Sequence, residues 1–336
     1  YPRSEDIWLK NGRIRVADFG FFEHLIEMEH LNLSHVPKLR CLICSNVKLK
    51  KLDLSAVPKL NALKCSINNL TKLELSKVPK LRYLECGNNE FSAIDLSGLK
   101  KLRALECQNN KLTRLDLHDL NRLVGLNCSN NLLTHLDLSN TKELEHLECS
   151  DNQLTSLDLT NVKLDYLHCG DNRLVELNAI NMLGLTELNC ENNPITHLYL
   201  SNMPELVELY CGNSQISYLD LKSAPKLHIF SCENNRLTQL DLYDMPELGA
   251  LYCAQNQLNE LDVTKLKEIE DLDCSDNRLN KLNLSDTSKL CQLYCAGNQL
   301  VDLDLTALKN LELLYCAYNK IVQLDVTFCP KLREIS

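Results

Sequence analysis

The sequence predicts a mainly β solenoid of about 14 coils, each 21 residues long. Three observations predict it. One pattern of apolar residues returns every 21 residues from Leu39 almost to the chain end, with a single 20-residue step between Cys149 and Cys169. An asparagine follows most of the marking cysteines by three residues. A cysteine occupies the same place in each of fourteen copies: Cys44, Cys65, Cys86, Cys107, Cys128, Cys149, Cys169, Cys190, Cys211, Cys232, Cys253, Cys274, Cys295 and Cys316. A fixed period in this range is typical of short units that stack into one continuous core.

One coil, residues 60–81, reads LNALKCSINNLTKLELSKVPKL. Leu63 and Cys65 alternate with small or polar residues, which predicts a strand with one buried face. The coil fits L-x-x-L-x-L-x-x-N/C-x-L, the consensus of the leucine-rich repeat. We therefore expect a right-handed superhelix or horseshoe with a parallel sheet on its concave face.

The recurring asparagines are predicted to be buried structural residues, because an amide can pair both the N–H and the C=O groups of a turning backbone. Val47 and Ser214 interrupt their column. About ten residues remain for the return path of each coil, which is too short for a helix with two loops. Ser-x-x-Pro segments disfavour helix there as well. We expect extended or 3₁₀ geometry on the convex side.

The domain organisation follows from the repeat. Residues 31–336 form the array, and residues 1–30 are predicted to be an N-terminal cap. The apolar residues expected to cover the first coil are Phe19, Phe21, Phe22, Leu25 and Met28. Lys331–Ser336 begins a fifteenth strand, and natural proteins rarely leave such an edge uncovered. Either this piece is the closing strand or the native chain continues into a further domain or anchor, and we favour continuation. The short repeat at 159–164 indicates either a change in curvature or a tolerated deletion, and we favour the deletion.

The chain holds 17 cysteines. Fourteen lie on the core side, where a reduced thiol behaves as a small hydrophobe. Cys41 and Cys44 form a C-x-x-C pair without the second pair that a zinc site needs, so no metal is expected. Cys41, Cys291 and Cys329 lie off the ladder at positions expected to be exposed. They are the candidates for reactive thiols, but we favour the interpretation that they are incidental surface cysteines.

Charge is uneven along the chain. Residues 1–112 hold 19 Lys+Arg and 12 Asp+Glu, whereas the whole chain has a net charge of −9. No apolar run of 18 residues predicts a membrane span. A nucleic-acid partner is not expected because a long basic face is lacking. The nine histidines are scattered and no catalytic or phosphate-binding motif occurs, so we expect neither an enzyme nor a cofactor.

The concave face is the expected binding surface. The column just before each cysteine changes from charged to aromatic along the chain: Ile43, Lys64, Glu85, Glu106, Asn127, Glu148, His168, Asn189, Tyr210, Ser231, Tyr252, Asp273, Tyr294 and Tyr315. The predicted ligand-binding residues are Tyr210, Tyr252, Tyr294, Tyr315, Tyr318, Glu187 and Glu208. Tyrosine gives a large contact area at low entropic cost, which suits a protein or glycan ligand. The alternative is that tyrosine only covers the sheet, since its strand propensity is high.

A second column stacks carboxylates on successive coils: Asp53, Glu74, Asp95, Asp116, Asp137, Asp158, Asp220, Asp241, Asp262, Asp304 and Asp325. Such a row repels itself unless each carboxylate accepts hydrogen bonds from the next coil or a calcium ion neutralises it. Calcium-binding coils have a denser Gly/Asp pattern, so hydrogen bonding is the favoured interpretation.

The unit quoted above, with cysteine in the ladder position, resembles bacterial internalin-type repeats of the cysteine-ladder variety, also found in surface proteins of Bacteroidetes. The resemblance covers residues 31–336, whereas residues 1–28 differ from the internalin helical cap. It implies a secreted or cell-surface protein that uses its concave face for adhesion or recognition. Separately, we expect the chain to be a monomer. The alternative is the target-selecting repeat domain of a cytosolic or injected bacterial effector.

Overall fold

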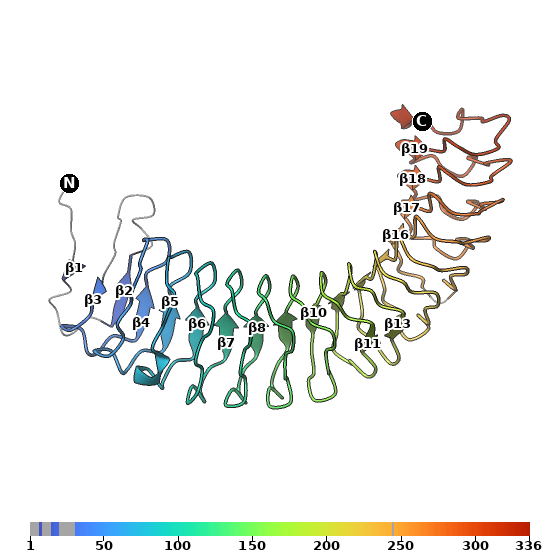
Figure 1. The fold of residues 1–336 in the computed structure, drawn as a ribbon. Helices are drawn as coiled ribbons and strands as arrows, with labels where there is room; N and C mark the ends of the chain where they lie inside the picture. The colour runs from blue at the N-terminus through green and yellow to red at the C-terminus, as the bar shows by residue number, and fades with distance from the viewer. Residues whose placement is uncertain (1–6, 9–14, 20–30, 244) are drawn as a thin grey trace. The chain divides into compact units, whose positions relative to one another are not determined.

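A computed structural model of the chain describes residues 7–8, 15–19, 31–243 and 245–336. The chain divides into two compact units, Tyr1–Leu164 and Asp165–Ser336. Both are parallel β-solenoids with the leucine-rich repeat fold that the sequence predicts (Figure 1).

In the first unit, β2 begins a parallel sheet that adds one strand per coil. A separate pair joins β1 (Ile7–Trp8) to β3 (Leu31–Asn32). The sheet strands are β2 (Val16–Asp18), β4 (Cys41–Ile43), β5 (Ala62–Lys64), β6 (Tyr83–Glu85), β7 (Ala104–Glu106), β8 (Gly125–Asn127) and β9 (His146–Glu148).

The second unit continues the same plan. Its sheet strands are β10 (Tyr166–His168), β12 (Glu187–Asn189), β14 (Glu208–Tyr210), β15 (Ile229–Ser231), β16 (Ala250–Tyr252), β17 (Asp271–Asp273), β18 (Gln292–Tyr294), β19 (Leu313–Tyr315) and β20 (Glu334–Ile335). The strand expected at the C-terminal end is therefore present, because β20 pairs in parallel with β19.

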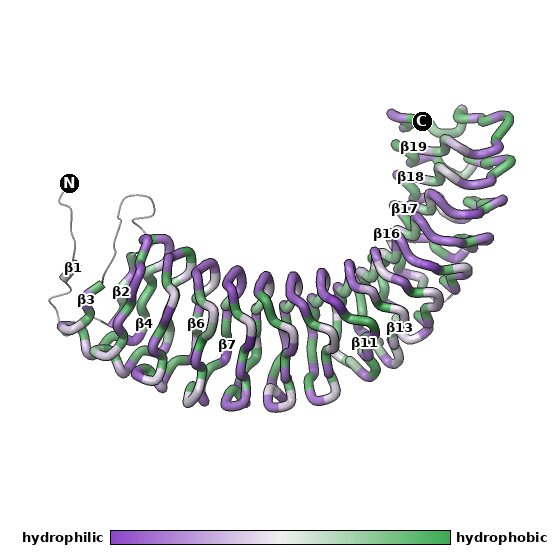
Figure 2. The backbone as a smooth tube through the Cα atoms, viewed as in Figure 1, coloured by the Kyte–Doolittle hydropathy of each residue, from purple (hydrophilic) through white to green (hydrophobic). Residues whose placement is uncertain are grey.

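The strands pair in register, so each side chain lies beside its equivalent in the next coil. Leu63 faces Leu84, for example, and Lys64 faces Glu85. The central leucine of β5 and the following Cys65 are both fully buried. Figure 2 shows the resulting alternation of hydrophobic and hydrophilic residues in coil after coil. No coil has a core of its own, so each is stabilised by its neighbours.

The asparagine column is buried and hydrogen-bonded, as predicted. Asn193 is 2% exposed. Its amide nitrogen donates to the carbonyl oxygens of Cys169 at 3.0 Å and Cys190 at 3.1 Å, and its oxygen accepts from the N–H of Leu174 at 3.0 Å. One side chain thus satisfies backbone groups of two coils, which would otherwise be unpaired.

The residue just before each of these asparagines has a positive φ. Asparagine, aspartate or glycine occupies this position in most coils, as at Asn88 (φ 54°) and Gly297 (φ 67°). Ile67 (φ 56°), Gln255 (φ 55°) and Tyr318 (φ 55°) are exceptions. A bulky or β-branched residue is strained in this left-handed region.

Among the described residues, the return side of the coils consists of turns and extended segments, with a 3₁₀ helix at η2 (Leu75–Lys77). The prediction for the convex side was incomplete in one place. There β11 (Glu176–Asn178) pairs with β13 (His197–Tyr199). Leu177 and Leu198 are buried between exposed neighbours, and the register lets the two backbones pair.

Two expectations about cysteines were wrong. Cys329 is 5% exposed, because it lies against the last coils and its thiol is 3.9 Å from the carbonyl oxygen of Leu305. Cys316 is only partly buried, unlike the other thirteen ladder cysteines. Cys41 and Cys291 are partly exposed, and all 17 cysteines are free thiols.

The predicted cap falls mainly outside the described residues. Of its apolar residues, Phe21, Phe22, Leu25 and Met28 lie there. Phe19 is described and is 6% exposed, and its N–H donates to the carbonyl oxygen of Ile43 at 2.8 Å. The cap itself stays a proposal.

Candidate functional site

We define the tyrosine face as the outward strand positions of the second unit that hold Tyr210, Tyr252, Tyr294 and Tyr315. These four side chains are partly buried. The rings of Tyr294 and Tyr315 stack with centroids 4.9 Å apart and planes inclined by 12°. The register of β18 and β19 produces this stack because it places the two residues side by side.

Tyr210 and Tyr252 are separated by one strand, on which Ser231 occupies the equivalent position. A small side chain between two large ones leaves a hollow of about 650 Å³. It is lined by Glu191, Tyr210, Asn213, Ser231, Glu233, Tyr252, Ala254, Gln255 and Asp273.

Two carboxylates share one donor in this hollow. The hydroxyl of Ser231 lies 2.9 Å from Oε2 of Glu233 and 3.4 Å from Oε1 of Glu191. A hydroxyl has one hydrogen, so it serves one carboxylate at a time. Burial, and next the charge of Glu233, raise the pKa of Glu191. Gly212 lies between the two acids, and a Cβ there would be 3.2 Å from Cγ of Glu233 and 3.5 Å from Oε1 of Glu191.

Acids orient the hydroxyls of Tyr210 and Tyr252, whereas Tyr294 donates to the amide oxygen of Gln292 at 3.1 Å. Tyr210 donates to Glu208 at 2.8 Å, and Tyr252 donates to Asp271 at 3.1 Å. Burial, followed by the charge of Asp271, raises the pKa of Tyr252 to about 12. Burial also raises the pKa of Asp271, and its Oδ1 is buried without a hydrogen-bond partner among the described residues.

The predicted site residues are only partly brought together. Glu208 lies beside Tyr210, as expected for one surface. Glu187 lies beside Glu208 on the neighbouring strand, and its Oε1 is 2.6 Å from Nε2 of His168. Tyr315 donates to Glu334. Tyr318 lies in a loop and is 90% exposed.

Sequence reasoning missed Glu191, Glu233, Ser231 and Asp273 as residues around the hollow. A signal for two of them was present. The residue just after each ladder cysteine is small or neutral in every coil except those with Glu191 and Glu233. An exceptional charge in one column of a repeat array therefore indicated the site.

The aspartate column behaves differently from the expectation. The carboxylates do not accept hydrogen bonds from the next coil in the predicted way. They accept locally, from the N–H two residues further along the same coil, as in Ser139 to Asp137 at 2.9 Å and Thr306 to Asp304 at 2.9 Å. The backbone N–H and then the hydroxyl of Ser139 lower the pKa of Asp137, because both stabilise the ionised form.

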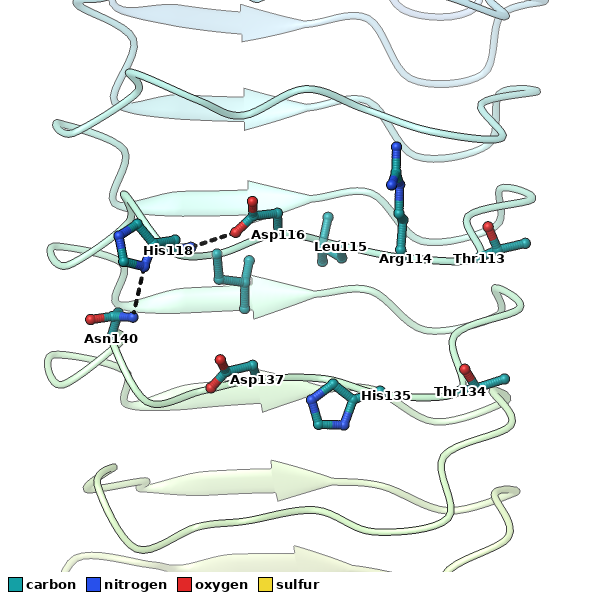
Figure 3. A pocket seen from close by; sticks show the side chains of 10 residues that line it. Thr113, Arg114, Leu115, Asp116, His118, Thr134, His135, Asp137 and Asn140 are labelled. Carbon is teal, nitrogen blue, oxygen red and sulfur yellow. Dashed lines mark hydrogen bonds between the residues drawn. The ribbon is translucent and has the colours of Figure 1, made fainter.

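This column lines a second hollow of about 200 Å³ in the first unit, between two coils (Figure 3). Asp116 accepts from the N–H of His118, and His118 Nδ1 lies 3.2 Å from the amide nitrogen of Asn140. Among the described residues, no group of three or more His, Cys, Asp or Glu side chains could hold a metal ion. Within the same ranges, no helix has the length and apolarity that a membrane span requires.

Neither a protein-family model nor a curated protein matches the chain. Solved structures do. The functional domain of InlJ from Listeria monocytogenes, which includes a cysteine ladder, is 32% identical, covers 89% of this chain and superposes with a TM-score of 0.71. This chain spans 65% of the length of that structure.

Two further structures have the same fold. The leucine-rich repeat protein LIC12759 from Leptospira interrogans is 22% identical, with 96% of each chain covered and a TM-score of 0.74. YopM from Yersinia enterocolitica is 25% identical, covering 91% of this chain and 77% of its own, with a TM-score of 0.64.

Proposed function

We propose, from the premise that this chain is an internalin-like leucine-rich repeat protein with a buried cysteine ladder, that it is a recognition or adhesion module. Arrays of this kind are binding scaffolds with extended surfaces. In this proposal the chain acts as a monomer at the bacterial cell surface and binds a protein or glycan through the tyrosine face.

The observation that supports this proposal most directly is the hollow between Tyr210 and Tyr252. The two tyrosine rings flank a hollow lined by polar side chains. The carboxylates of Glu191 and Glu233 both lie within hydrogen-bonding distance of the Ser231 hydroxyl. A basic side chain from a partner would supply the donors that Ser231 lacks. It would also interact favourably with the aromatic faces. A protein with an exposed lysine or arginine is thus the favoured ligand.

The stack of Tyr294 and Tyr315 supports the glycan alternative. Two nearly parallel rings offer a broad aromatic surface with few rotatable bonds, so little entropy is lost on binding. Sugars bind such surfaces through their apolar faces, and the ring hydroxyls give adjacent hydrogen-bonding groups.

The test is capture of ligands by the purified chain. It is presented to host extracellular matrix, host surface proteins and bacterial envelope glycans, beside a variant with Tyr210→Ala, Tyr252→Ala and Tyr294→Ala. We expect the wild type to retain a surface protein or glycan and the variant to lose it. A loss of at least tenfold in affinity is expected, since buried aromatic contacts often contribute about 2 kcal/mol each.

A matched control uses three tyrosines that lie outside the tyrosine face, Tyr199, Tyr218 and Tyr243, which are 43%, 62% and 72% exposed. Their triple alanine variant should bind as the wild type does. Equal loss in both variants would contradict the site. Capture of cytosolic proteins alone would instead support the effector alternative.

A further inference from the structure

The first unit carries a row of cations that the second unit does not. We define the cationic ladder as two exposed columns on either side of a buried leucine, just before the sheet strands. One column holds Lys38, Lys59, Lys80, Lys101 and Arg122. The other holds Arg15, Arg40, Arg82 and Arg103, with the neutral Asn61 between Arg40 and Arg82. Backbone hydrogen bonds hold the second column in register, as from the N–H of Arg103 to the carbonyl oxygen of Arg82 at 2.8 Å.

None of these cations forms an ion pair within the described part of the chain. The same columns of the second unit are neutralised from coil to coil. Lys226 pairs with Glu205 at 2.6 Å, and Lys289 pairs with Glu268 at 2.5 Å. Arg333 pairs with Glu312 at 3.4 Å. The unpaired charge is therefore a property of the first unit and not a requirement of the fold.

Neighbouring rungs of the ladder are about 4.8 Å apart, the spacing of strands in a sheet. Like charges on neighbouring rungs repel each other even in water. An external row of anions with a similar repeat would remove this repulsion. Arg82, Lys101, Arg103 and Arg122 surround a hollow of about 320 Å³ that can hold part of such a ligand. Glu143, the next residue in the column, also lines the hollow and ends the cationic run.

We propose that the cationic ladder binds a linear polyanionic polysaccharide, one with sulfate or carboxylate groups repeated along an extended chain. Five rungs span roughly 20 Å, enough for several charged sugar units. Single-stranded nucleic acid is disfavoured because its binding sites combine cations with successive aromatic platforms. Beside this ladder, within the described ranges, Tyr83 is the one exposed aromatic side chain.

An anionic lipid surface is disfavoured for another reason. Interfacial binding normally adds apolar side chains that enter the headgroup region. The leucines between the two columns, such as Leu81 and Leu102, are completely buried and are not available for insertion.

The test measures binding of a fluorescein-labelled heparin oligosaccharide by fluorescence anisotropy at several salt concentrations. The variant carries Lys101→Gln and Arg103→Gln. We expect it to bind at least tenfold more weakly than the wild type. The slope of log K against log salt should be shallower by about 2, since each lost charge contact removes about 1.

The matched control carries Lys265→Gln and Lys267→Gln, two exposed lysines of the second unit that lie outside the ladder. It loses the same net charge and should bind heparin as the wild type does. Equal weakening of both variants would overturn the proposal, because net charge alone would then explain binding. Circular dichroism confirms that both variants are folded.

Two other probes complete the design. Tighter binding of an oligo(dT) strand than of heparin, or binding of phosphatidylserine vesicles without binding of heparin, would overturn the proposal in favour of nucleic acid or lipid. The alanine variant of the tyrosine face should bind heparin normally. Failure of the proposed recognition function is therefore distinguishable from failure of this ladder.

Discussion

Ser214 occupies the asparagine position opposite the backbone N–H of Ile195, but its hydroxyl donates to the carbonyl oxygen of Gly212 at 3.4 Å. In the next coil, Asn235 accepts from the corresponding N–H of Ile216 at 2.9 Å. Within the described residues, no group accepts from the N–H of Ile195. Ile195 is fully buried, so its N–H is a buried donor without a partner among the described residues.

The substitution Ser214→Asn should stabilise the second unit. The new amide would reach the N–H of Ile195 and the carbonyl oxygens of the ladder cysteines, as Asn235 does in its own coil. We expect a gain of about 1–2 kcal/mol in the free energy of unfolding, measured by urea denaturation. The reverse change, Asn235→Ser, should cost a similar amount. No gain from Ser214→Asn would show that the N–H is already satisfied by water.

Replacing Ile67→Asn should stabilise the first unit. Ile67 is 54% exposed and has a φ of 56°, a conformation that is costly for a β-branched side chain and tolerated by asparagine. We expect a gain of about 1 kcal/mol in the free energy of unfolding. The opposite substitution in the next coil, Asn88→Ile, serves as the control and should lose a comparable amount. An unchanged midpoint in both variants would contradict the strain.

Replacing Glu191→Gln should change how stability depends on pH. The pKa of Glu191 is raised above 4.5 in the folded chain. The folded state therefore holds this proton more tightly than the unfolded state, and stability is lost as pH rises from 4.5 through the raised pKa. Glutamine does not titrate, so the variant does not lose stability in this way as pH rises. Its free energy of unfolding, relative to the wild type, should increase between about pH 4 and about pH 7 in urea denaturation.

Asp137→Asn is the control of opposite sign. The pKa of Asp137 is lowered below 3.8 by the N–H and hydroxyl of Ser139. Its stabilising contribution is present above 3.8 and is lost as pH falls through the lowered pKa. The difference between Asp137→Asn and the wild type should therefore stay constant above about pH 5 and shrink in acid. A matching trend in the two variants would refute the environment assigned to Glu191.

Alkylation of the native chain should separate its thiols. Cys41, Cys291 and Cys316 are partly exposed and should react with iodoacetamide first. The buried ladder thiols should react only after unfolding, because burial both blocks the reagent and raises their pKa, to about 12 at Cys65. Peptide mass spectrometry gives the order. Early labelling of Cys329 would contradict its burial.

The repeat made the fold and the core predictable, because one pattern recurs often enough to identify each column by its chemistry. The fully buried Cys65 and the hydrogen-bonded Asn193 follow from this reasoning. The hollow between Tyr210 and Tyr252 could not be predicted in this way, because it depends on which side chains lie next to each other on neighbouring strands. Ser231 must fall between Tyr210 and Tyr252, and Gly212 must leave room for the acids.

Two local features had no clear signal in the sequence. The pairing of Glu176–Asn178 with His197–Tyr199 arises on the return side, where the repeat predicts only extended chain. The burial of Cys329 depends on contact with earlier coils, which its position in the sequence does not reveal.

The division between Leu164 and Asp165 does lie within the repeat that is one residue short. The expectation that a long basic face is lacking was wrong for the first unit, because the in-register coils align basic residues that the sequence showed only as an excess before residue 113.

In-register pairing of successive coils has an evolutionary consequence. Duplication or loss of one 21-residue segment changes the length of a column without disturbing its order, because most coils present the same hydrogen-bonding groups to the next. Gene recombination between repeats can therefore lengthen a row of charged residues, or add one more aromatic residue to a column, in a single event. A point mutation can then change the side chain at one position of a column while the fold of the repeats stays the same.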